Sequence, residues 1–166
     1  MDPLQEGEGT PVAFASQIPL FAREQLTPEL VAEITPLLVR HYDEVAVDKD
    51  IPLSPRWDVY FGMQEKGNLY IYTSRLAGRL IGYNAFINDK HLHYSTAESS
   101  GNDVIFIDPT ERGFGRQFIR WTIERLRAAG VQLNSYHVKL SHDWGHILRE
   151  MGFEPREVVW VKRLDK

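Results

Sequence analysis

The most constraining feature of this sequence is a short apolar run that leads through a glycine-containing turn into an amphipathic segment. The run Val104-Ile105-Phe106-Ile107 is apolar at every position, as is typical of a central strand buried on both faces, and Pro109 ends it. After the turn, one helical face is lined by Phe118, Ile119, Thr122, Ile123 and Leu126. Gly130 is placed to end that helix. This junction predicts a sheet with helices packed against it.

Two helices are predicted upstream of the junction. Thr27-Pro28-Glu29 combines a capping threonine with a proline suited to the first helical turn, and a kink or break is expected near Pro36. Ser54-Pro55 repeats this signal, so a second helix should run toward Gly67. The other predicted elements are strands over 69–73, 79–87, 91–94, 136–140 and 157–161, turns over 76–78 and 88–90, a loop over 95–102, and a helix over 143–150 that stops at Gly152.

The composition is that of a globular domain. Of the 166 residues, 43% are apolar and 25% are charged, so we expect a flexible tail over residues 1–10 and a single domain over residues 11–166. The absence of cysteine excludes disulfides, a thiolate nucleophile and a cysteine-bound metal. No apolar run approaches the roughly 18 residues that span a bilayer, and the acidic N-terminus does not resemble a signal peptide. A cytoplasmic location is therefore expected.

The turn itself has the residues of an anion site. Gly113 and Gly115 let the backbone approach a ligand closely and allow positive φ if it is required. The free N–H groups at the start of the following helix favour a group such as a pyrophosphate. Arg112 and Arg116 add charged donors. Two glycines alone, however, are equally compatible with a plain connection between strand and helix.

Three other phosphate-binding motifs do not fit this turn. A P-loop would end in Gly-Lys-Ser or Gly-Lys-Thr, and that ending is missing. A dinucleotide fingerprint would need a third glycine where Phe118 stands. A kinase glycine loop would lie between two strands, whereas this turn opens a helix. The nucleotide-binding readings are therefore set aside.

The turn resembles the best-known motif of the GNAT superfamily of N-acetyltransferases. That motif reads Arg/Gln-x-x-Gly-x-Gly/Ala at a junction between strand and helix. Arg112 and Gly115 fall on its fixed positions with Gly113 between them, whereas Gln117 replaces the final glycine or alanine. Met151-Gly152-Phe153 matches a second feature, a short helix that ends in Gly-Phe. The order of elements agrees from about 69 to 164, and the details look most like small acetyltransferase-like proteins of phages and bacteria.

This resemblance implies both a fold and an activity. The fold would be of the α/β (α+β) class, with a mixed, mostly antiparallel sheet and helices on both faces. The activity would be transfer of an acetyl or similar acyl group from acetyl-CoA (coenzyme A) to a primary amine, by direct attack on the thioester. The implied coenzyme A contacts are backbone groups of Ile105, Phe106 and Ile107 and the turn residues Arg112, Gly113, Phe114, Gly115, Arg116 and Gln117.

The residues that would move protons are less clearly marked. Glu98, expected on a loop over the acceptor site, is the first candidate for the general base, and Asp103 is the second. Many family members place a proton-donating tyrosine where this chain has Leu148. His142 is then the preferred donor to the thiolate, ahead of Tyr136 and His137. Each of these side chains could instead be a solvated or packing residue.

The expected partner is a small-molecule or protein amine. The net charge of −4 gives no sign of the basic surface that nucleic acids require, so neither nucleic acid nor a membrane is expected, while a homodimer is left open. Two histidine pairs, His142/His146 and His91/His93, have spacings that could bind a metal, but a surface or packing role is expected for both. No metal site is predicted. An alternative function follows from Leu148: a regulatory protein that binds acyl-CoA with weak or no catalysis.

Overall fold

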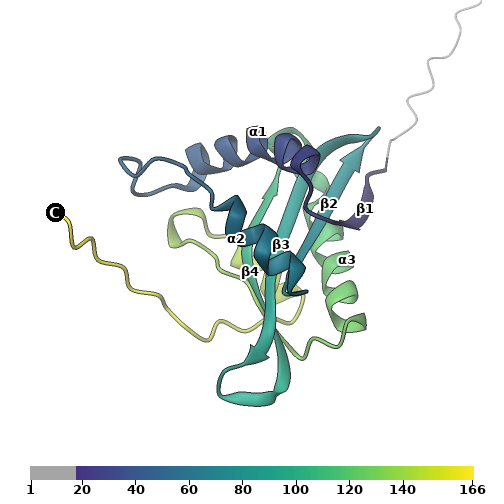
Figure 1. Ribbon diagram of the computed structural model, residues 1–166, viewed down its shortest axis with the longest axis vertical. Helices are drawn as coiled ribbons and strands as arrows, with labels where there is room; N and C mark the ends of the chain where they lie inside the picture. The colour runs from purple at the N-terminus through teal and green to yellow at the C-terminus, as the bar shows by residue number, and fades with distance from the viewer. Residues whose placement is uncertain (1–17) are drawn as a thin grey trace, which may run out of the picture.

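The computed structural model describes residues 18–166 as a five-stranded sheet with helices on both faces (Figure 1). The strands are β1 (Leu20–Glu24), β2 (Leu69–Leu76), β3 (Arg79–His91), β4 (Tyr94–Ile107) and β5 (Leu133–Ser135). They lie in sequence order, with β1 to β4 antiparallel and β5 parallel to β4. The predicted mixed, mostly antiparallel sheet is confirmed. The tail predicted over residues 1–10 lies outside the described residues.

The helices divide the core into two layers. They are α1 (Pro28–Val45), α2 (Trp57–Glu65), α3 (Gly115–Ala128) and α4 (Gly145–Glu150), with 3₁₀ turns η1 (Pro109–Phe114) and η2 (Leu140–His142). On one sheet face α1 and α2 pack over Leu69, Ile71 and Phe106. On the other face α3 buries Phe118 and Leu126 against the sheet. No helix within residues 18–166 is long and apolar enough to cross a membrane.

Helix α1 runs without a break through Pro36, so of the predicted kink or break the break does not occur. Its start is as expected, because the Thr27 hydroxyl accepts a hydrogen bond from the backbone N–H of Leu30. Ile34 before the proline and Leu37 after it are both buried in the same core. Packing on both sides of Pro36 offsets the hydrogen bond that proline cannot donate.

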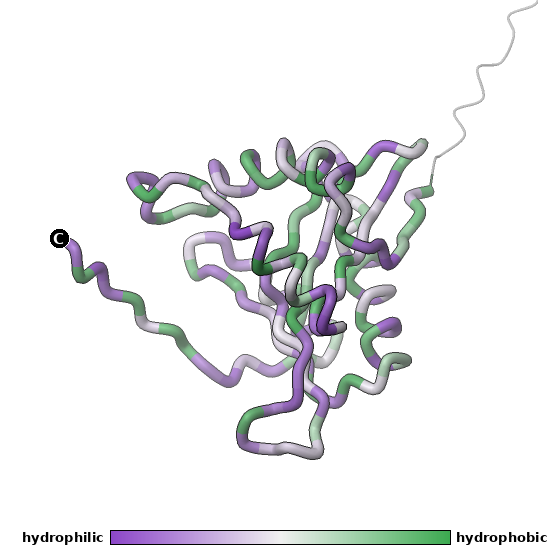
Figure 2. The backbone as a smooth tube through the Cα atoms, viewed as in Figure 1, coloured by the Kyte–Doolittle hydropathy of each residue, from purple (hydrophilic) through white to green (hydrophobic). Residues whose placement is uncertain are grey.

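The hairpin between β2 and β3 is confirmed, and the one between β3 and β4 is longer than predicted. Ala77 and Gly78 both have positive φ, as a tight two-residue hairpin requires. The turn predicted over 88–90 and the loop predicted over 95–102 are wrong, because β3 continues to His91 and β4 begins at Tyr94. The last residues of β3 are hydrophilic (Figure 2). Backbone hydrogen bonds extend the ladder beyond the core, where side-chain hydrophobicity gives no signal.

Two strands predicted in the C-terminal part are absent from the described structure. Strand β5 ends at Ser135, and residues 136–140 continue without strand pairing. Residues 157–161 are also not a strand, and Trp160 is 92% exposed. In Figure 1 this yellow segment runs away from the sheet, so its backbone pairs with no strand. The predicted helix over 143–150 is confirmed as α4, and Gly152 with φ 84° ends it.

Gly82 gives a test of how closely β3 and β4 pack. A Cβ at this position would lie 2.9 Å from the carbonyl oxygen of Phe106 and 3.1 Å from Cγ1 of Ile107. Because the backbone oxygen cannot move away freely, Gly82→Ala should lower the free energy of unfolding by about 1–3 kcal/mol in urea denaturation. Gly62→Ala is the control, since no atom lies within 4 Å of its added Cβ. Equal stability of the two variants would contradict the close packing at Gly82.

Candidate active site

Strands β4 and β5 separate soon after they meet. Their pairing is limited to Ser99↔Leu133, Ser100↔Asn134 and Gly101↔Ser135. Beyond Gly101, β4 continues to Ile107 with no strand partner on that side within residues 18–166. An open edge of this kind can pair with an extended ligand through backbone hydrogen bonds. The predicted contacts at Ile105, Phe106 and Ile107 all fall on this part of β4.

A β-bulge in β4 lies at the start of this open edge. Ala85 pairs with Val104 and Phe86 pairs with Asn102, so Asp103 is an extra residue with no partner in β3. The Asn102 side-chain amide donates to Asn84 Oδ1 at 2.7 Å and to the backbone oxygens of Ala85 and Val104 at 3.2 Å. These bonds hold the bulge in place. A bulge also re-aims its own side chain, here that of Asp103.

The Asp103 carboxylate is held from the helix side by Tyr60. The Tyr60 hydroxyl donates to Asp103 Oδ2 at 2.6 Å. Burial and then this hydrogen bond to the carboxylate raise the pKa of Tyr60 above its usual value, so the phenol keeps its proton. Tyr60 lies on α2, far from Asp103 along the chain, and no sequence motif marks this contact. The result is an oriented, solvent-accessible carboxylate at the bulge.

The other end of the open edge is fixed by Asp108. Its two carboxylate oxygens accept hydrogen bonds from Arg40 of α1, both at 2.9 Å, and Oδ1 also accepts from the backbone N–H of Thr110. The Arg40 hydrogen bond is the main cause that holds the Asp108 pKa well below its usual range. Asp108 is only 4% exposed. The first turn of η1 is therefore tied to α1.

The glycine turn takes a helical form rather than a left-handed one. Neither Gly113 nor Gly115 has positive φ, and the chain passes through η1 directly into α3. A Cβ at Gly115 would meet Cδ1 of Ile107 at 3.3 Å, whereas a Cβ at Gly113 would meet nothing within 4 Å. Protein packing therefore does not require a glycine at position 113. Open space in front of its backbone suits a ligand that approaches closely.

Both arginines of the turn have carboxylate partners. Arg112 Nη2 donates to Glu44 Oε1 at 2.6 Å, and Arg116 pairs with Glu150 of α4. Glu44 also lies 2.7 Å from His142 Nε2, so this histidine belongs to the arginine end of the site. Glu44 could not be predicted as a site residue, because it is far from Arg112 along the chain and no motif marks it. The two arginine side chains remain half-exposed beside their carboxylate partners.

The two predicted general bases are separated by the structure. Glu98 lies on β4 opposite Lys90, not on a loop, so its expected position is wrong. It is five residues before Asp103, which corresponds to about 17 Å along a strand. Asp103 lies at the bulge, next to the open edge. The polar composition of 95–102 suggested a loop, but β4 includes these residues and carries Glu98 away from the separation of the strands.

Tyr136 directly follows β5, at the point where the chain stops pairing with β4. Its hydroxyl accepts a hydrogen bond from the Asn84 amide at 3.3 Å, which links it to the bulge through Asn102. Its ring packs edge-on against Phe86, Trp144 and Phe153. Burial raises the pKa of Tyr136 above its usual value. Leu148 is only 7% exposed and packs in the interior, and its side chain cannot donate a proton.

Comparison with known proteins identifies the fold. No protein-family model and no curated protein sequence matches this chain. An aminoglycoside acetyltransferase from an uncultured soil metagenomic sample, solved with sisomicin, has a TM-score of 0.65 at 12% identity, over 87% of this chain and 97% of its own. The ribosomal-protein-alanine N-acetyltransferase of Brucella melitensis biovar Abortus has a TM-score of 0.64 at 15% identity, over 87% and 99%.

A third similar structure is not named as an acetyltransferase. A transcriptional regulator from Bacillus halodurans has a TM-score of 0.68 at 14% identity, over 87% of this chain and 100% of its own. Glucosamine-6-phosphate N-acetyltransferase from Arabidopsis thaliana is again similar, with a TM-score of 0.61 at 12% identity, over 88% and 99%. These identities establish the fold alone. The chain has the fold of GNAT-type N-acetyltransferases, as its motifs predicted.

The ion pair at Asp108 should make stability depend on pH. A carboxylate whose pKa is lowered by folding stabilises the fold at pH values above its pKa in the unfolded chain, which is near 3.9. This stabilisation is lost as the pH falls from there toward the lower pKa of the folded protein. Asp108→Asn should therefore cost about 1–3 kcal/mol at pH 7, and the difference from wild type should narrow below about pH 4. Urea denaturation at several pH values measures both effects.

Asp58→Asn is the control for this prediction. Asp58 also pairs with an arginine, Arg56, but both side chains are largely exposed. The free energy of unfolding of this variant should be close to that of the wild type, because exposed ion pairs contribute little to stability. A pH-independent loss in Asp108→Asn would show that the ion pair with Arg40 is not the source of its stabilisation.

Proposed function

We propose that this chain is an N-acyltransferase that moves an acetyl or similar acyl group from coenzyme A to a primary amine. The observation that supports this most directly is the open edge of β4. It runs from an oriented carboxylate at Asp103 to a glycine turn with Arg112 and Arg116. An extended ligand with an anionic end and a reactive end fits an edge with these two termini.

The residues at the arginine end suit the pyrophosphate of coenzyme A. Gly113 leaves its backbone open, the first N–H groups of α3 follow, and Arg112 and Arg116 provide charged donors. Backbone groups of Ile105 to Ile107 would hold the pantetheine arm along the edge of β4. When bound, acyl-CoA supplies a thioester whose C–S bond breaks as the amine forms its new C–N bond, with the electron pair leaving on sulfur.

Asp103 is the residue that we assign as general base. An amine must be neutral to attack, and a carboxylate at the bulge can accept its proton directly or through one water. The hydrogen bond from Tyr60 fixes the direction in which the carboxylate points. Glu98 lies farther along the strand, opposite Lys90, so it cannot act as the base at the position of Asp103.

Tyr136 is the residue that we assign as proton donor to the departing sulfur. Its hydroxyl oxygen accepts from Asn84, which leaves its own proton free to donate. The raised pKa of Tyr136 means that the phenol carries its proton at neutral pH. His142 is held by Glu44 beside Arg112, so we assign it to the phosphate end instead.

A coenzyme A-binding protein without efficient catalysis is the second candidate. Leu148 favours it, since this buried side chain stands where a proton-donating tyrosine would be expected. The two functions share the turn and the open edge. They differ in whether Asp103 and Tyr136 support turnover, which the two experiments below separate.

Coenzyme A binding is tested at Gly113. Gly113→Asp should weaken the affinity for coenzyme A by about 30-fold. The new carboxylate would repel a bound phosphate, and a repulsion of roughly 2 kcal/mol corresponds to this change in Kd. The measurement is isothermal calorimetry with coenzyme A. Gly62→Asp introduces the same charge on α2, away from the turn, and should bind as wild type does. Unchanged affinity in Gly113→Asp would contradict the assignment of the turn.

Turnover is tested at Asp103. Asp103→Asn should lower kcat/KM by about 10²- to 10⁴-fold in a thiol-release assay with acetyl-CoA and a panel of primary amines, while the Kd for coenzyme A stays the same. Tyr136→Phe tests the proton donor in that assay and should lower kcat. Binding of coenzyme A without turnover of any amine by the wild type would favour the second candidate. Wild-type rates in both variants would refute the assigned roles.

A further inference from the structure

Four consecutive apolar residues near the C-terminus are exposed. Val158, Val159, Trp160 and Val161 have exposed fractions between 65% and 92%. Single apolar side chains are ordinary on a protein surface, whereas a contiguous exposed apolar patch marks an interaction site. The run has no polar face, as is typical of a strand that is covered on both sides. Residues 157–161 therefore have the sequence of a strand but lack the neighbours that a strand needs.

This donor segment, residues 157–161, is anchored at both ends by its own chain. Before it, the Phe153 ring packs edge-on against Tyr136, with centroids 5.6 Å apart. After it, Arg163 Nη1 donates to Asp50 Oδ1 at 3.2 Å. Figure 1 shows the yellow chain between these anchors clear of the sheet. No backbone hydrogen bond joins the donor segment to another part of residues 18–166, so its backbone groups face solvent unpaired.

The last strand of the sheet has a free edge. β5 pairs with β4 on one side, and its other side has no strand partner in the part of the chain that the structure describes. Past β5 the side chains continue to alternate between half-buried and exposed as far as Lys139, as they do along a strand with one face on the core. An unpaired edge accepts another strand through backbone hydrogen bonds. We call residues 133–139 the receiving edge.

We propose that this chain forms a homodimer in which the donor segment of each copy pairs with the receiving edge of the other. Each copy donates once and receives once, so the contact is isologous and closes without adding further copies. Covering a tryptophan side chain buries about 150–250 Å². The two-fold contact covers Trp160, its three valine neighbours and the receiving edge twice, which reaches the roughly 1,200–2,000 Å² of a stable interface. The proposal does not depend on acyl transfer.

Charge and aromatic complementarity favour one antiparallel register. When Glu157 lies opposite Lys139, the opposite charges at the two ends of the pairing come together, and Trp160 lies opposite Tyr136. Opposite charges and aromatic side chains in directly opposed positions both stabilise strand pairs. Since Tyr136 is the proton donor assigned above, the contact borders the candidate active site.

A second copy suits the donor segment better than the receiving edge of the same chain. Arg163 and Lys166 both pair with Asp50, in the connection between α1 and α2. These ion pairs hold the end of the donor segment away from its own sheet (Figure 1). The segment is thereby presented in extended form, so a partner meets a strand that has already lost much of its conformational freedom.

The molar mass in solution is the first test. Sedimentation velocity of the full chain should show a dimer, and Trp160→Lys should raise the Kd of the dimer by about 100-fold, as expected for the loss of one large buried apolar side chain. Leu92→Lys is the control, since Leu92 is 96% exposed at the tip of the β3–β4 hairpin and should leave the dimer intact. A monomeric wild type, or equal Kd values for the two variants, would overturn the proposal.

Cysteine pairing distinguishes contact between copies from contact within one chain. The sequence has no cysteine, so introduced cysteines report without background. His137→Cys and Val159→Cys lie opposite one another in the proposed register, and oxidation of a mixture of the two variants should give a disulfide-linked heterodimer, identified by its mass. Val39→Cys, on α1, replaces Val159→Cys in the control mixture and should not link to His137→Cys. A chain with both substitutions that forms its disulfide as a monomer would overturn the proposal.

Discussion

One extra residue in β4 sets the geometry on which the candidate site depends. Side chains alternate between the two faces of a strand, so an inserted residue changes which positions face which layer. After Asp103, Val104 and Phe106 face α1 and α2, while Ile107 packs with α3. The bulge is stable because the Asn102 amide bonds three acceptors on two strands. A buried amide with this many partners specifies a single register.

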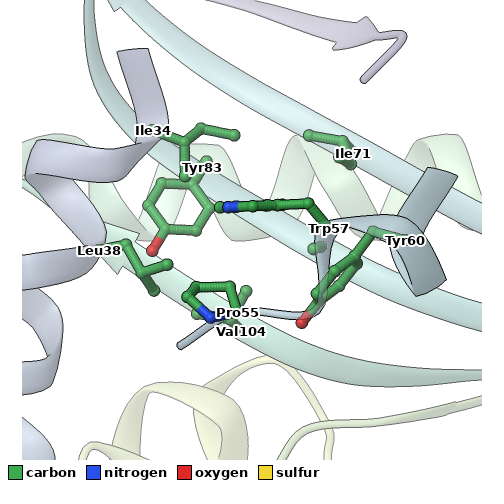
Figure 3. A pocket seen from close by; sticks show the side chains of 9 residues that line it. Ile34, Leu38, Pro55, Trp57, Tyr60, Ile71, Tyr83 and Val104 are labelled. Atoms are coloured by element: carbon green, nitrogen blue, oxygen red, sulfur yellow. The ribbon is translucent and has the colours of Figure 1, made fainter. Parts of the chain in front are cut away.

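Helix α1 connects the two ends of the site. Ile34 and Leu38, one turn apart, line a small apolar pocket that Tyr60 also lines (Figure 3), and Arg40 and Glu44, again one turn apart, hold Asp108 and Arg112. A single helix therefore positions both the apolar pocket and the glycine turn. Its continuity through Pro36 matters for this reason, since a break there would separate Ile34 from Leu38, Arg40 and Glu44.

Periodic patterns predicted the elements that are held by packing. The run at 104–107, the helical face from Phe118 to Leu126 and the glycine cap at Gly130 all follow from local sequence, as does the turn between them. The extension of the β3–β4 hairpin did not, because backbone pairing outside the core leaves no hydrophobic pattern. Residues 157–161 show the reverse error, since strand-forming side chains make a strand only when the segment lies against the edge of a sheet.

The candidate site was predicted in its backbone and only partly in its side chains. The glycines and arginines of the turn are local, so the motif marks them. The bulge at Asp103 depends on a register between two strands, and the contacts of Tyr60, Glu44 and Tyr136 join segments far apart in the chain. No short pattern encodes such contacts. Position along a strand, rather than residue type, distinguishes Asp103 from Glu98.

The carboxylates beside Arg112 and Arg116 change what an anion would gain by binding there. The guanidinium groups are already neutralised by Glu44 and Glu150, so an incoming anion exchanges with a carboxylate rather than with water alone. Its net free energy is the difference between two anions at the same cation. Such an exchange would favour a ligand that replaces both carboxylates together over a singly charged inorganic ion. Each arginine keeps a carboxylate partner when no ligand is bound.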